Sequence, residues 1–542
     1  MKRITANGGQ PGPEATGGTR PETRLRVVFG ALSLVLLLAA LDQTIVSTAL
    51  PTIVGDLGGL QHLSWVVTAY LLASTVVSPV YGKLGDVYGR KRVLQVAIVI
   101  FLAGSALCGL AQTMTQLIAF RALQGLGGGG LIVVALATVG DLVPPRQRGR
   151  YQGLFGAVFG VATVLGPLLG GFLVDNLSWR WIFYINLPLG LVALAVIAMG
   201  FPSTAARERH PIDYLGALVL GGAVSGIVLF TSLGGTTYAW SSPTLIGILA
   251  AALALLAAFP LVESRAADPL VPKELVRTRT FRVTSAVSFV VGFALFGAVT
   301  FLPLYLQVVK GHSPTGSGLL MTPMMAGVLV TSILSGNLIT RLGRYRMFPI
   351  AGTAIATVAL ALLSRIDVGT SVWVTSADML LLGFGLGLVM QVLVLAAQNA
   401  VPHRLLGVAT STTTTFRQIG GSIGVSAFGA IFANRLGVEL AERLPRGVHL
   451  PAHPALSTIR QLPRVVHDLY VAAFAAALHP VFLAAAGVAF VGFLLTWLLP
   501  DVTLRSTTGA GDEPVESEPV AAEPLRPARP PRSREASPAG RR

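Results

Sequence analysis

Two charged residues stand inside long apolar runs of the sequence. Asp42 lies in the run 27–50, and Arg121 lies in the run 115–140. A charge within a membrane-spanning segment is costly and usually serves a function. A carboxylate that is hard to keep ionised in apolar surroundings suits the uptake and release of a proton. We therefore expect Asp42 to carry protons, with Arg121 as its partner.

The depths of these two residues leave a contact between them open. Asp42 lies eight residues before the end of its run, about 12 Å, and Arg121 lies six residues after the start of its run, about 9 Å. The topology inferred from the loops puts both of these helix ends on one face of the bilayer. Either the pair is a permanent structural contact, or it is made and broken as Asp42 gains and loses its proton.

The rest of the chain is apolar enough to lie in lipid. Of its 542 residues, 53% are hydrophobic and 12% are charged, and the mean hydropathy is +0.70. Soluble domains carry about 25% charged residues. The net charge of +16 would suit nucleic-acid binding in a soluble protein, but here the basic residues lie in short loops between apolar runs. We therefore expect the lipid bilayer, and no nucleic acid, as a partner.

Fourteen apolar runs are long enough to cross a bilayer, which takes about 20 residues. The predicted spans are 27–50, 62–82, 93–112, 115–140, 152–174, 181–201, 213–233, 243–263, 281–306, 316–339, 347–364, 373–398, 408–432 and 476–499. Basic residues gather in alternate loops, which places both termini in the cytoplasm by the positive-inside rule. The sequence therefore predicts an all-α polytopic protein of the cell (inner) membrane.

The fourteen runs divide as six, two and six. The predicted domains are a cytoplasmic tail at 1–26, a six-helix bundle at 27–201, a two-helix linker insert at 202–280, a six-helix bundle at 281–502 and a tail at 503–542. Little in the last tail can be buried, because it is rich in Pro, Glu, Arg and Ser, and we expect it to be disordered. Within the second bundle, 433–475 is predicted to be an extracellular loop.

The two bundles carry a repeat. Segments 82–92 and 336–346 agree at five of eleven positions, and both follow the second helix of a six-helix set. Paired halves of parallel orientation are typical of secondary transporters. In the first copy, Gly82 and Gly89 allow helix ends to approach closely, Asp86 suits a helix N-terminus, and Arg90 has Asp141 as a plausible partner. The segment is either a basic loop that sets topology or a conformational latch.

These segments resemble the signatures of a known family. The segment 82–92 resembles the loop 2–3 signature of the major facilitator superfamily. Segments 41–51 and 121–125 resemble the helix-1 and helix-4 motifs of its fourteen-span drug:proton antiporter family, and 179–188 resembles the usual start of helix 6. The segment 156–171 in helix 5 resembles the antiporter motif of that family, with Gly160, Gly166, Pro167, Gly170 and Gly171 as its characteristic residues.

The resemblance implies the major facilitator fold, with two six-helix bundles and two extra central helices, and export rather than uptake. For the helix-5 motif two interpretations remain, a pliant seal between the two halves or ordinary close packing of helices. The candidate residues of a substrate cavity are Gln43, Gln124, Asp378, Gln391 and Arg417. Arg417 is suited to a substrate carbonyl or anion, or only to helix-end carbonyls, and Asp378 is either interfacial or a second acidic site.

Other classes of protein lack support in the sequence. A Walker A motif, a catalytic triad and metal-ligand spacing are absent, and Cys108 is the single cysteine. We therefore expect no enzyme and no cofactor. The leading hypothesis is a monomeric, proton-coupled antiporter that exports small amphipathic or cationic compounds. The alternatives are an exporter or flippase of a lipid or biosynthetic product, and a membrane receptor that transports nothing.

Overall fold

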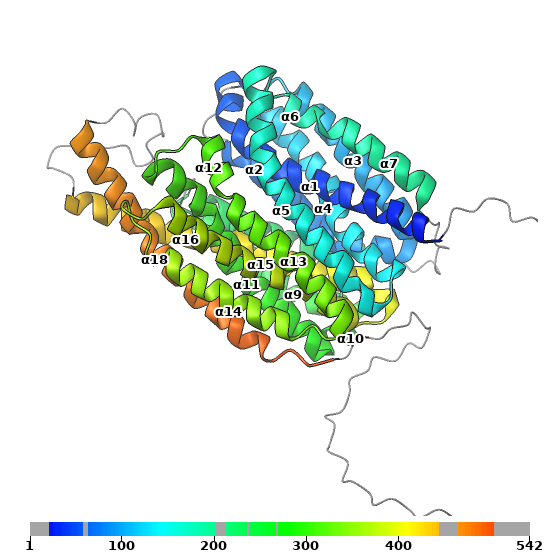
Figure 1. Ribbon diagram of the computed structural model, residues 1–542. Coiled ribbons are helices and arrows are strands. Elements are labelled where there is room, and N and C mark those ends of the chain that lie inside the picture. The colour runs from blue at the N-terminus through cyan, green and yellow to red at the C-terminus, as the bar shows by residue number, and fades with distance from the viewer. Residues whose placement is uncertain are drawn as a thin grey trace, which may run out of the picture.

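The computed structural model describes residues 21–57, 63–201, 213–235, 238–266, 269–443, 463–502 and 504. These residues form long helices that gather in two halves. In Figure 1 the N-terminal half runs from blue to cyan and lies beside the C-terminal half, which runs from green to orange.

The N-terminal half ends at residue 201. Its helices are α1 (Pro21–Leu57), α2 (Leu63–Tyr88), α3 (Arg90–Leu110), α4 (Met114–Leu142), α5 (Pro145–Asn176), α6 (Trp181–Tyr184) and α7 (Asn186–Gly200). Gly89 separates α2 from α3 at φ 87°, a left-handed conformation that favours glycine. Thr113 caps α4 by accepting a hydrogen bond from the Gln116 amide. Local sequence thus explains both helix ends.

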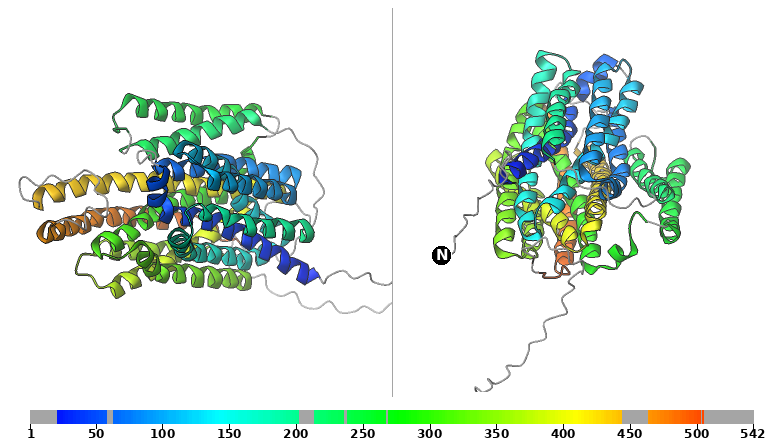
Figure 2. Two further views of the ribbon diagram at one scale, coloured as in Figure 1. Left: turned by 90° about the horizontal axis from the view of Figure 1, so that it is seen from above. Right: turned by 90° about the vertical axis from the view of Figure 1, so that its right-hand side faces the viewer.

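The insert between the halves consists of α8 (Tyr214–Leu233), α9 (Pro243–Arg265) and the short α10 (Lys273–Arg277). Figure 2 shows α8 and α9 side by side on the flank of the bundle. Asp213 and Ser242 cap their N-termini. Ser426 of the C-terminal half donates a 2.6 Å hydrogen bond to the Thr231 carbonyl of α8, which fastens the insert to that half.

The C-terminal half repeats the arrangement of the first. Its elements are α11 (Arg279–Leu304), the π-helical turn η2 (Tyr305–Val309), α12 (Pro314–Leu320), α13 (Thr322–Leu342), α14 (Met347–Leu363), α15 (Val372–Asn399), the 3-10 turn η3 (His403–Leu405), α16 (Leu406–Arg443) and α18 (Arg464–Thr496). Gly343, at φ 68°, ends α13 in the left-handed conformation common at helix C-termini.

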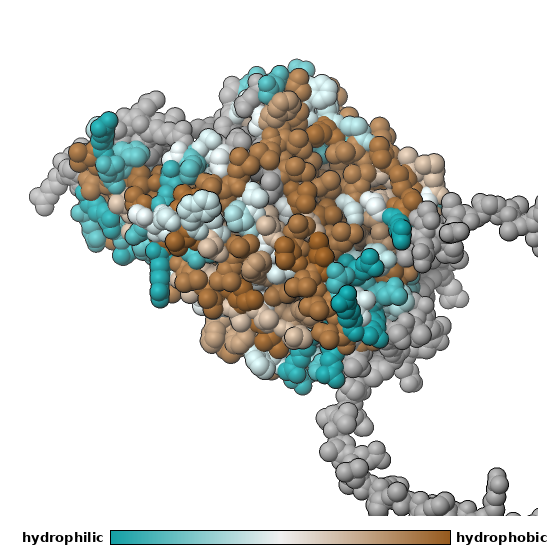
Figure 3. Space-filling view, in the orientation of Figure 1, coloured by the Kyte–Doolittle hydropathy of each residue, from teal (hydrophilic) through white to brown (hydrophobic). Residues whose placement is uncertain are grey.

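Each half has its own apolar core. Leu32, Phe101 and Phe155 are fully buried in the N-terminal half, and Leu382 and Phe482 are fully buried in the C-terminal half. The outer surface is also apolar. In Figure 3 brown apolar residues cover the middle of the visible face, and hydrophilic residues gather towards its ends. A surface of this kind suits the hydrocarbon core of a bilayer.

The number of spans differs from the prediction. Within the described residues, twelve helices are long and apolar enough to cross a membrane. The two further predicted spans correspond to α14, a shorter apolar helix, and to α5, which has 32 residues but is not among the twelve. The all-helical membrane fold is therefore confirmed, whereas the count of fourteen stays a prediction.

The expected loop at 433–475 is largely helical where the structure describes it. Helix α16 continues to Arg443, and α18 begins at Arg464. Glu439 pairs with Arg435 at 2.8 Å and with Arg443 at 2.7 Å, four residues away on either side, and such pairs stabilise a polar helix end. Hydropathy detects the part of a helix that suits lipid and misses this polar extension. Residues 444–462, the first 20 residues and the tail beyond 504 lie outside the described residues.

Hydrogen bonds between the two halves gather at the end of the bundle that carries 82–92 and 336–346, which we call the basic end. Gly149 of α5 and Gly336 of α13 lie so close that a Cβ on either would meet the backbone carbonyl of the other. Arg146 donates hydrogen bonds to the carbonyls of Thr340 at 2.9 Å and Arg341 at 2.8 Å. The halves are therefore closed against each other at the basic end.

Candidate functional site

Asp42 of α1 lies wholly inside the N-terminal half, with none of its surface exposed. Its Oδ2 accepts a hydrogen bond from Arg121 Nη1 at 2.8 Å, which forms a buried ion pair. Its Oδ1 accepts hydrogen bonds from Gln124 Nε2 at 2.8 Å and from Asn186 Nδ2 at 3.0 Å. The contact between Asp42 and Arg121, which their similar depth in the membrane allowed, is thus present. Both oxygens of the Asp42 carboxylate have hydrogen-bond partners.

Arg121 is held from three helices. Besides Asp42 of α1, its Nη1 donates to Gln124 Oε1 at 2.7 Å on α4, and its Nε donates to the Val66 carbonyl at 3.2 Å on α2. Its guanidinium carbon lies 4.3 Å from the centre of the Tyr70 ring, a cation–π contact. Arg121 is 1% exposed, so these protein groups replace the water that the cation would otherwise bind.

Two residues that sequence reasoning missed complete the cluster. Ser105 Oγ of α3 accepts hydrogen bonds from Gln124 at 3.1 Å and Asn186 at 3.0 Å, and it donates to the Phe183 carbonyl at 2.8 Å. Asn186 lies in the segment 179–188 that resembles the start of helix 6, which was a signal for it. Ser105 had no comparable signal, because a serine in an apolar helix is common.

Glycines of α3 and α4 let the helices of this cluster approach closely. A Cβ on Gly104 would meet the backbone of Gln124, and a Cβ on Gly125 would meet the Tyr70 carbonyl. Gly127 lies against the backbone of Phe101 in the same way. The glycine run of α4 therefore packs helices together, and it does not form a loop that could hold phosphate.

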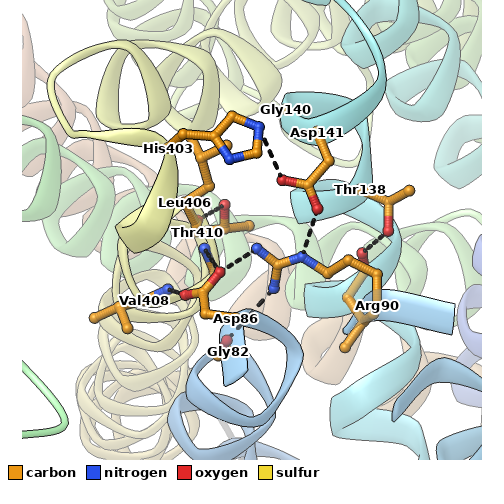
Figure 4. Close-up of polar contacts among 12 residues, drawn as sticks. Gly82, Asp86, Arg90, Thr138, Gly140, Asp141, His403, Leu406, Val408 and Thr410 are labelled. Atoms are coloured by element: carbon orange, nitrogen blue, oxygen red, sulfur yellow. Dashed lines mark hydrogen bonds and ion pairs between the residues drawn. The ribbon is translucent and has the colours of Figure 1, made fainter. Parts of the chain in front are cut away.

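The predicted latch connects three helices of the N-terminal half with one of the C-terminal half (Figure 4). Arg90 pairs with Asp86 four residues earlier, and its Nε donates to Asp141 Oδ2 on α4 at 3.0 Å. The Asp86 carboxylate accepts hydrogen bonds from the amides of Gly407 at 3.1 Å and Val408 at 3.2 Å, at the start of α16. Asp86 thus places a negative charge at a helix N-terminus, where it is favourable.

Close packing at the latch depends on two glycines. A Cβ on Gly82 would meet the Gly407 carbonyl and the Ser411 side chain, and a Cβ on Gly407 would meet the Gly82 carbonyl. The second copy of the repeat packs in the same way, because its Gly336 lies against Gly149 of the N-terminal half. The repeated segments 82–92 and 336–346 therefore both lie where one half meets the other, and only the first carries the carboxylate.

The glycines of helix α5 serve two different interfaces. Gly153 and Gly156 lie against Ser332 of α13, so they pack between the halves. Gly160 makes only an ordinary contact, with its Cβ position 3.4 Å from the Met325 carbonyl, and Gly166 packs on Thr44 of α1 within the N-terminal half. Gly170 is buried and Gly171 is half-buried. The tight contact between the halves thus falls at Gly153 and at Gly156, which begins the segment 156–171 that resembles the antiporter motif.

The cavity candidates occupy both halves. Gln124 belongs to the Asp42 cluster, and Gln43 is half-buried beside it on α1. Asp378 is half-buried on α15, whereas Gln391 and Arg417 are 4% and 8% exposed on α15 and α16. The structure thus brings Gln124 to Asp42, while Asp378, Gln391 and Arg417 lie in the other half.

A polar contact that crosses the halves joins Gln398 of α15 to α4. Its Nε2 donates to the Leu136 carbonyl at 3.0 Å and to Thr410 Oγ1 of α16 at 2.9 Å. Nearby, Arg148 of α5 donates to the Gly140 carbonyl at 2.8 Å. No group of three or more His, Cys, Asp or Glu side chains that could hold a metal ion occurs in the described part of the chain.

Two bundled halves, a buried acid–base pair in one of them and an apolar outer surface define a membrane protein of the secondary-transporter class. Residues 32–425 match the family model described as Major Facilitator Superfamily, and the chain belongs to that family. The expectation of a transporter rather than an enzyme is thereby confirmed.

Similar proteins include bacterial multidrug transporters. The chain is 48% identical over 500 residues to an uncharacterized MFS-type transporter of Mycobacterium tuberculosis, with 92% of this chain and 73% of that protein covered. It is 41% identical over 423 residues to the multidrug transporter protein MdtP of Bacillus subtilis, with 78% of each covered. The crystal structure of the human organic anion transporter MFSD10 matches its fold with a TM-score of 0.60 at 16% identity, covering 88% of this chain and 100% of that one.

Proposed function

We propose that the protein exports small amphipathic or cationic compounds across the cell (inner) membrane in exchange for protons. The observation that carries this proposal is the fully buried Asp42–Arg121 pair, with its 2.8 Å contact inside a membrane span. Relatives named multidrug transporters support the cargo, and the positive-inside rule supports a cytoplasmic basic end.

The Asp42 cluster offers a physical route from protonation to movement. A proton on Asp42 cancels its charge and leaves the buried Arg121 without its counter-charge. Removing one partner of a buried ion pair costs about 3–5 kcal/mol, which is enough to drive a change between two conformations. Because Asp42 and Arg121 belong to different helices, rearrangement of these helices would relieve that cost. Proton binding is thereby linked to the conformation of the N-terminal half.

The basic end gives the second part of the cycle. With the halves closed there by Asp86, Gly149 and Gly336, a compound between them has access only from the opposite end. Opening the latch would give access from the cytoplasm. Export then requires that the compound binds when the basic end is open. It also requires that a proton taken up at the opposite end returns the transporter to the conformation that is open at the basic end.

The test is the variant Asp42→Asn in proteoliposomes with an acidic lumen. Amphipathic dyes such as rhodamine 110 and rhodamine 123 should accumulate with the wild-type protein. In the variant, accumulation driven by the pH gradient should fall to the level of protein-free vesicles, whereas exchange of dye at equal pH should persist. Asp56→Asn is the matched control, because Asp56 lies on the same helix and is exposed. Accumulation at the wild-type rate in Asp42→Asn would refute proton coupling through this residue.

A lipid substrate is the second candidate. A cavity of about 510 Å³ opens at the surface of the C-terminal half, between α12, α13 and the start of α15. Its lining is mostly apolar and consists of Leu319, Leu320, Thr322, Pro323, Ala326, Val372, Trp373 and Ser376. Trp373 is 86% exposed, so an acyl chain could reach the cavity from the bilayer. Movement of a fluorescent phospholipid between leaflets of the same vesicles would favour this candidate, and its absence would reject it.

A further inference from the structure

Arg417 is a buried cation inside helix α16. It is 8% exposed and lies eleven residues, about 16 Å, after the first residue of that helix. Close packing fixes its position, because Gly292 of α11 lies against the Arg417 backbone and Gly420 lies against the Phe289 carbonyl. Arg417 therefore belongs to a rigid contact between α11 and α16.

Arg417 has fewer polar partners than the other buried arginines of the described chain. Arg121 pairs with Asp42, and Arg90 pairs with Asp86 and Asp141. Among the described residues Arg417 forms no ion pair, and its recorded side-chain hydrogen bond goes from Nη1 to the Met390 carbonyl at 3.3 Å. Arg148 also forms no ion pair within this part of the chain, but it donates hydrogen bonds to the Val143 and Gly140 carbonyls and to Asn399 Oδ1. A guanidinium has five N–H donors, and leaving a charge buried without a counter-charge is costly.

The place of Arg417 in the bundle follows from the contact that crosses the halves. Gln398 of α15 donates hydrogen bonds to Thr410 of α16 and to the Leu136 carbonyl of α4, which belongs to the N-terminal half. Gln391 lies seven residues from Gln398 on α15, and Arg417 lies seven residues from Thr410 on α16. Each is therefore on the same face of its helix, about 10 Å closer to the end opposite the basic end. The two side chains therefore lie at one level, and Arg417 reaches α15 at the carbonyl of Met390, the residue next to Gln391.

Gln391 is also incompletely satisfied. It is 4% exposed, and its Oε1 has no hydrogen-bond partner within the described chain. A Cβ on Gly156 of α5 would meet Gln391 Cγ, so this side chain borders the interface between the halves. A guanidinium with free donors is the kind of group that binds a carboxylate, and the Gln391 amide can add a donor through Nε2 but not through Oε1, which only accepts.

We propose that Arg417, with Gln391 beside it, binds an anionic group, specifically a carboxylate, on the exported compound. This inference rests on the proposed export function and narrows its substrate class. The carboxylate supplies the counter-charge that the described residues of the C-terminal half do not provide for Arg417. A compound that carries only positive charge is repelled at this level, so the cations that the family resemblance suggested are poorer substrates unless they also carry an acid.

The test compares two dyes that share one ring system. Rhodamine 110 has a free carboxylate, and rhodamine 123 is its methyl ester. Binding of each dye to the purified full chain in lipid nanodiscs is measured by fluorescence anisotropy, for wild type, Arg417→Gln and Arg417→Lys. Arg365→Gln is the matched control, because it removes the same charge from an exposed site.

The wild-type protein should bind the acid more tightly than the ester. Arg417→Gln should weaken binding of the acid about tenfold or more, the loss expected for a hydrogen-bonded charge pair, and leave binding of the ester unchanged. Arg417→Lys should keep the preference for the acid with a smaller loss, and it provides the test if Arg417→Gln does not fold. The proposal is overturned if Arg417→Gln weakens binding of both dyes equally or of neither. It is also overturned if the wild-type protein binds the ester as tightly as the acid.

Transport distinguishes this proposal from the proposed function. Loss of pH-driven accumulation in Asp42→Asn together with unchanged discrimination between the two dyes supports both proposals. If the wild-type protein prefers the acid as expected but its dye accumulation does not depend on the pH gradient, the carboxylate site is supported and proton coupling is refuted.

Discussion

Removal of one charge at the latch should open the basic end. The side chains of Asp86 and Arg90 are 7% and 3% exposed, so their ion pair is not weakened by solvent. In Asp86→Asn the pair loses its charge, and the amide nitrogen that replaces one oxygen cannot accept, so one of the two hydrogen bonds from the Gly407 and Val408 amides is lost. Arg90 keeps its 3.0 Å contact with Asp141, which limits the loss.

The size of the effect follows from these contacts. Hydrogen bonds to a charged group contribute about 1.5–3 kcal/mol each, and a charge at a helix N-terminus contributes about 0.3–2 kcal/mol. Because Asp141 remains, we expect a net loss of about 2 kcal/mol for the closed state. That energy changes the ratio of closed to open molecules about thirtyfold.

Distances between spin labels on cysteines introduced at Arg92 and Met347 would measure this change. Both residues are exposed and lie at the basic end, one in each half. Cys108, the single native cysteine, is buried and should not react with the label. The variant should show a larger share of long distances than wild type. Glu274→Gln is the control, because Glu274 pairs with Arg404 at the surface and such pairs contribute little. An unchanged distance distribution in Asp86→Asn would refute the latch.

Three further variants examine the remaining contacts between the halves. Gly153→Leu should force α5 and α13 apart at the Ser332 carbonyl and abolish transport, whereas Gly160→Ala should be tolerated, since its Cβ position is 3.4 Å from the nearest atom; dye accumulation in proteoliposomes measures both. Gln398→Leu removes hydrogen bonds to Leu136 and Thr410 and should weaken closure by about 1–3 kcal/mol, and the same spin-label distances would show no shift if this reasoning is wrong.

Hydropathy and charge were sufficient for the general organisation of the protein. Asp42 and Arg121 were recognisable because a charge in an apolar run is rare, and the helical rise gave their similar depth. Asn186, which donates to Asp42, and Ser105, which accepts from Asn186, could not be found in the same way, because they come from α7 and α3 and reach the cluster only when the helices assemble. Sequence spacing describes neighbours on one helix and leaves open which helix lies opposite.

The contacts between the halves show the same limit. The glycine pattern at 156–171 predicted close helix contacts without their partners: Gly156 packs on α13 of the other half, as Gly149 and Gly153 do, whereas Gly166 packs on α1 of the same half. A glycine permits close approach to any neighbour, and the point where two helices cross decides which glycines are used. Likewise, Asp86 was recognisable as a helix-capping residue, whereas the helix that it caps lies more than 300 residues further along the chain.

The sequence by itself determined that the chain lies in a membrane, that it carries a repeated segment and that a carboxylate lies inside a membrane span, because these properties depend on composition and local spacing. Only the tertiary structure decided that Asp42 is paired, that Asp86 caps α16, and that Arg417 lacks an acidic partner in the described chain. The physical reason is that the cost of a buried charge depends on every group around it, and those groups are brought together by helix packing.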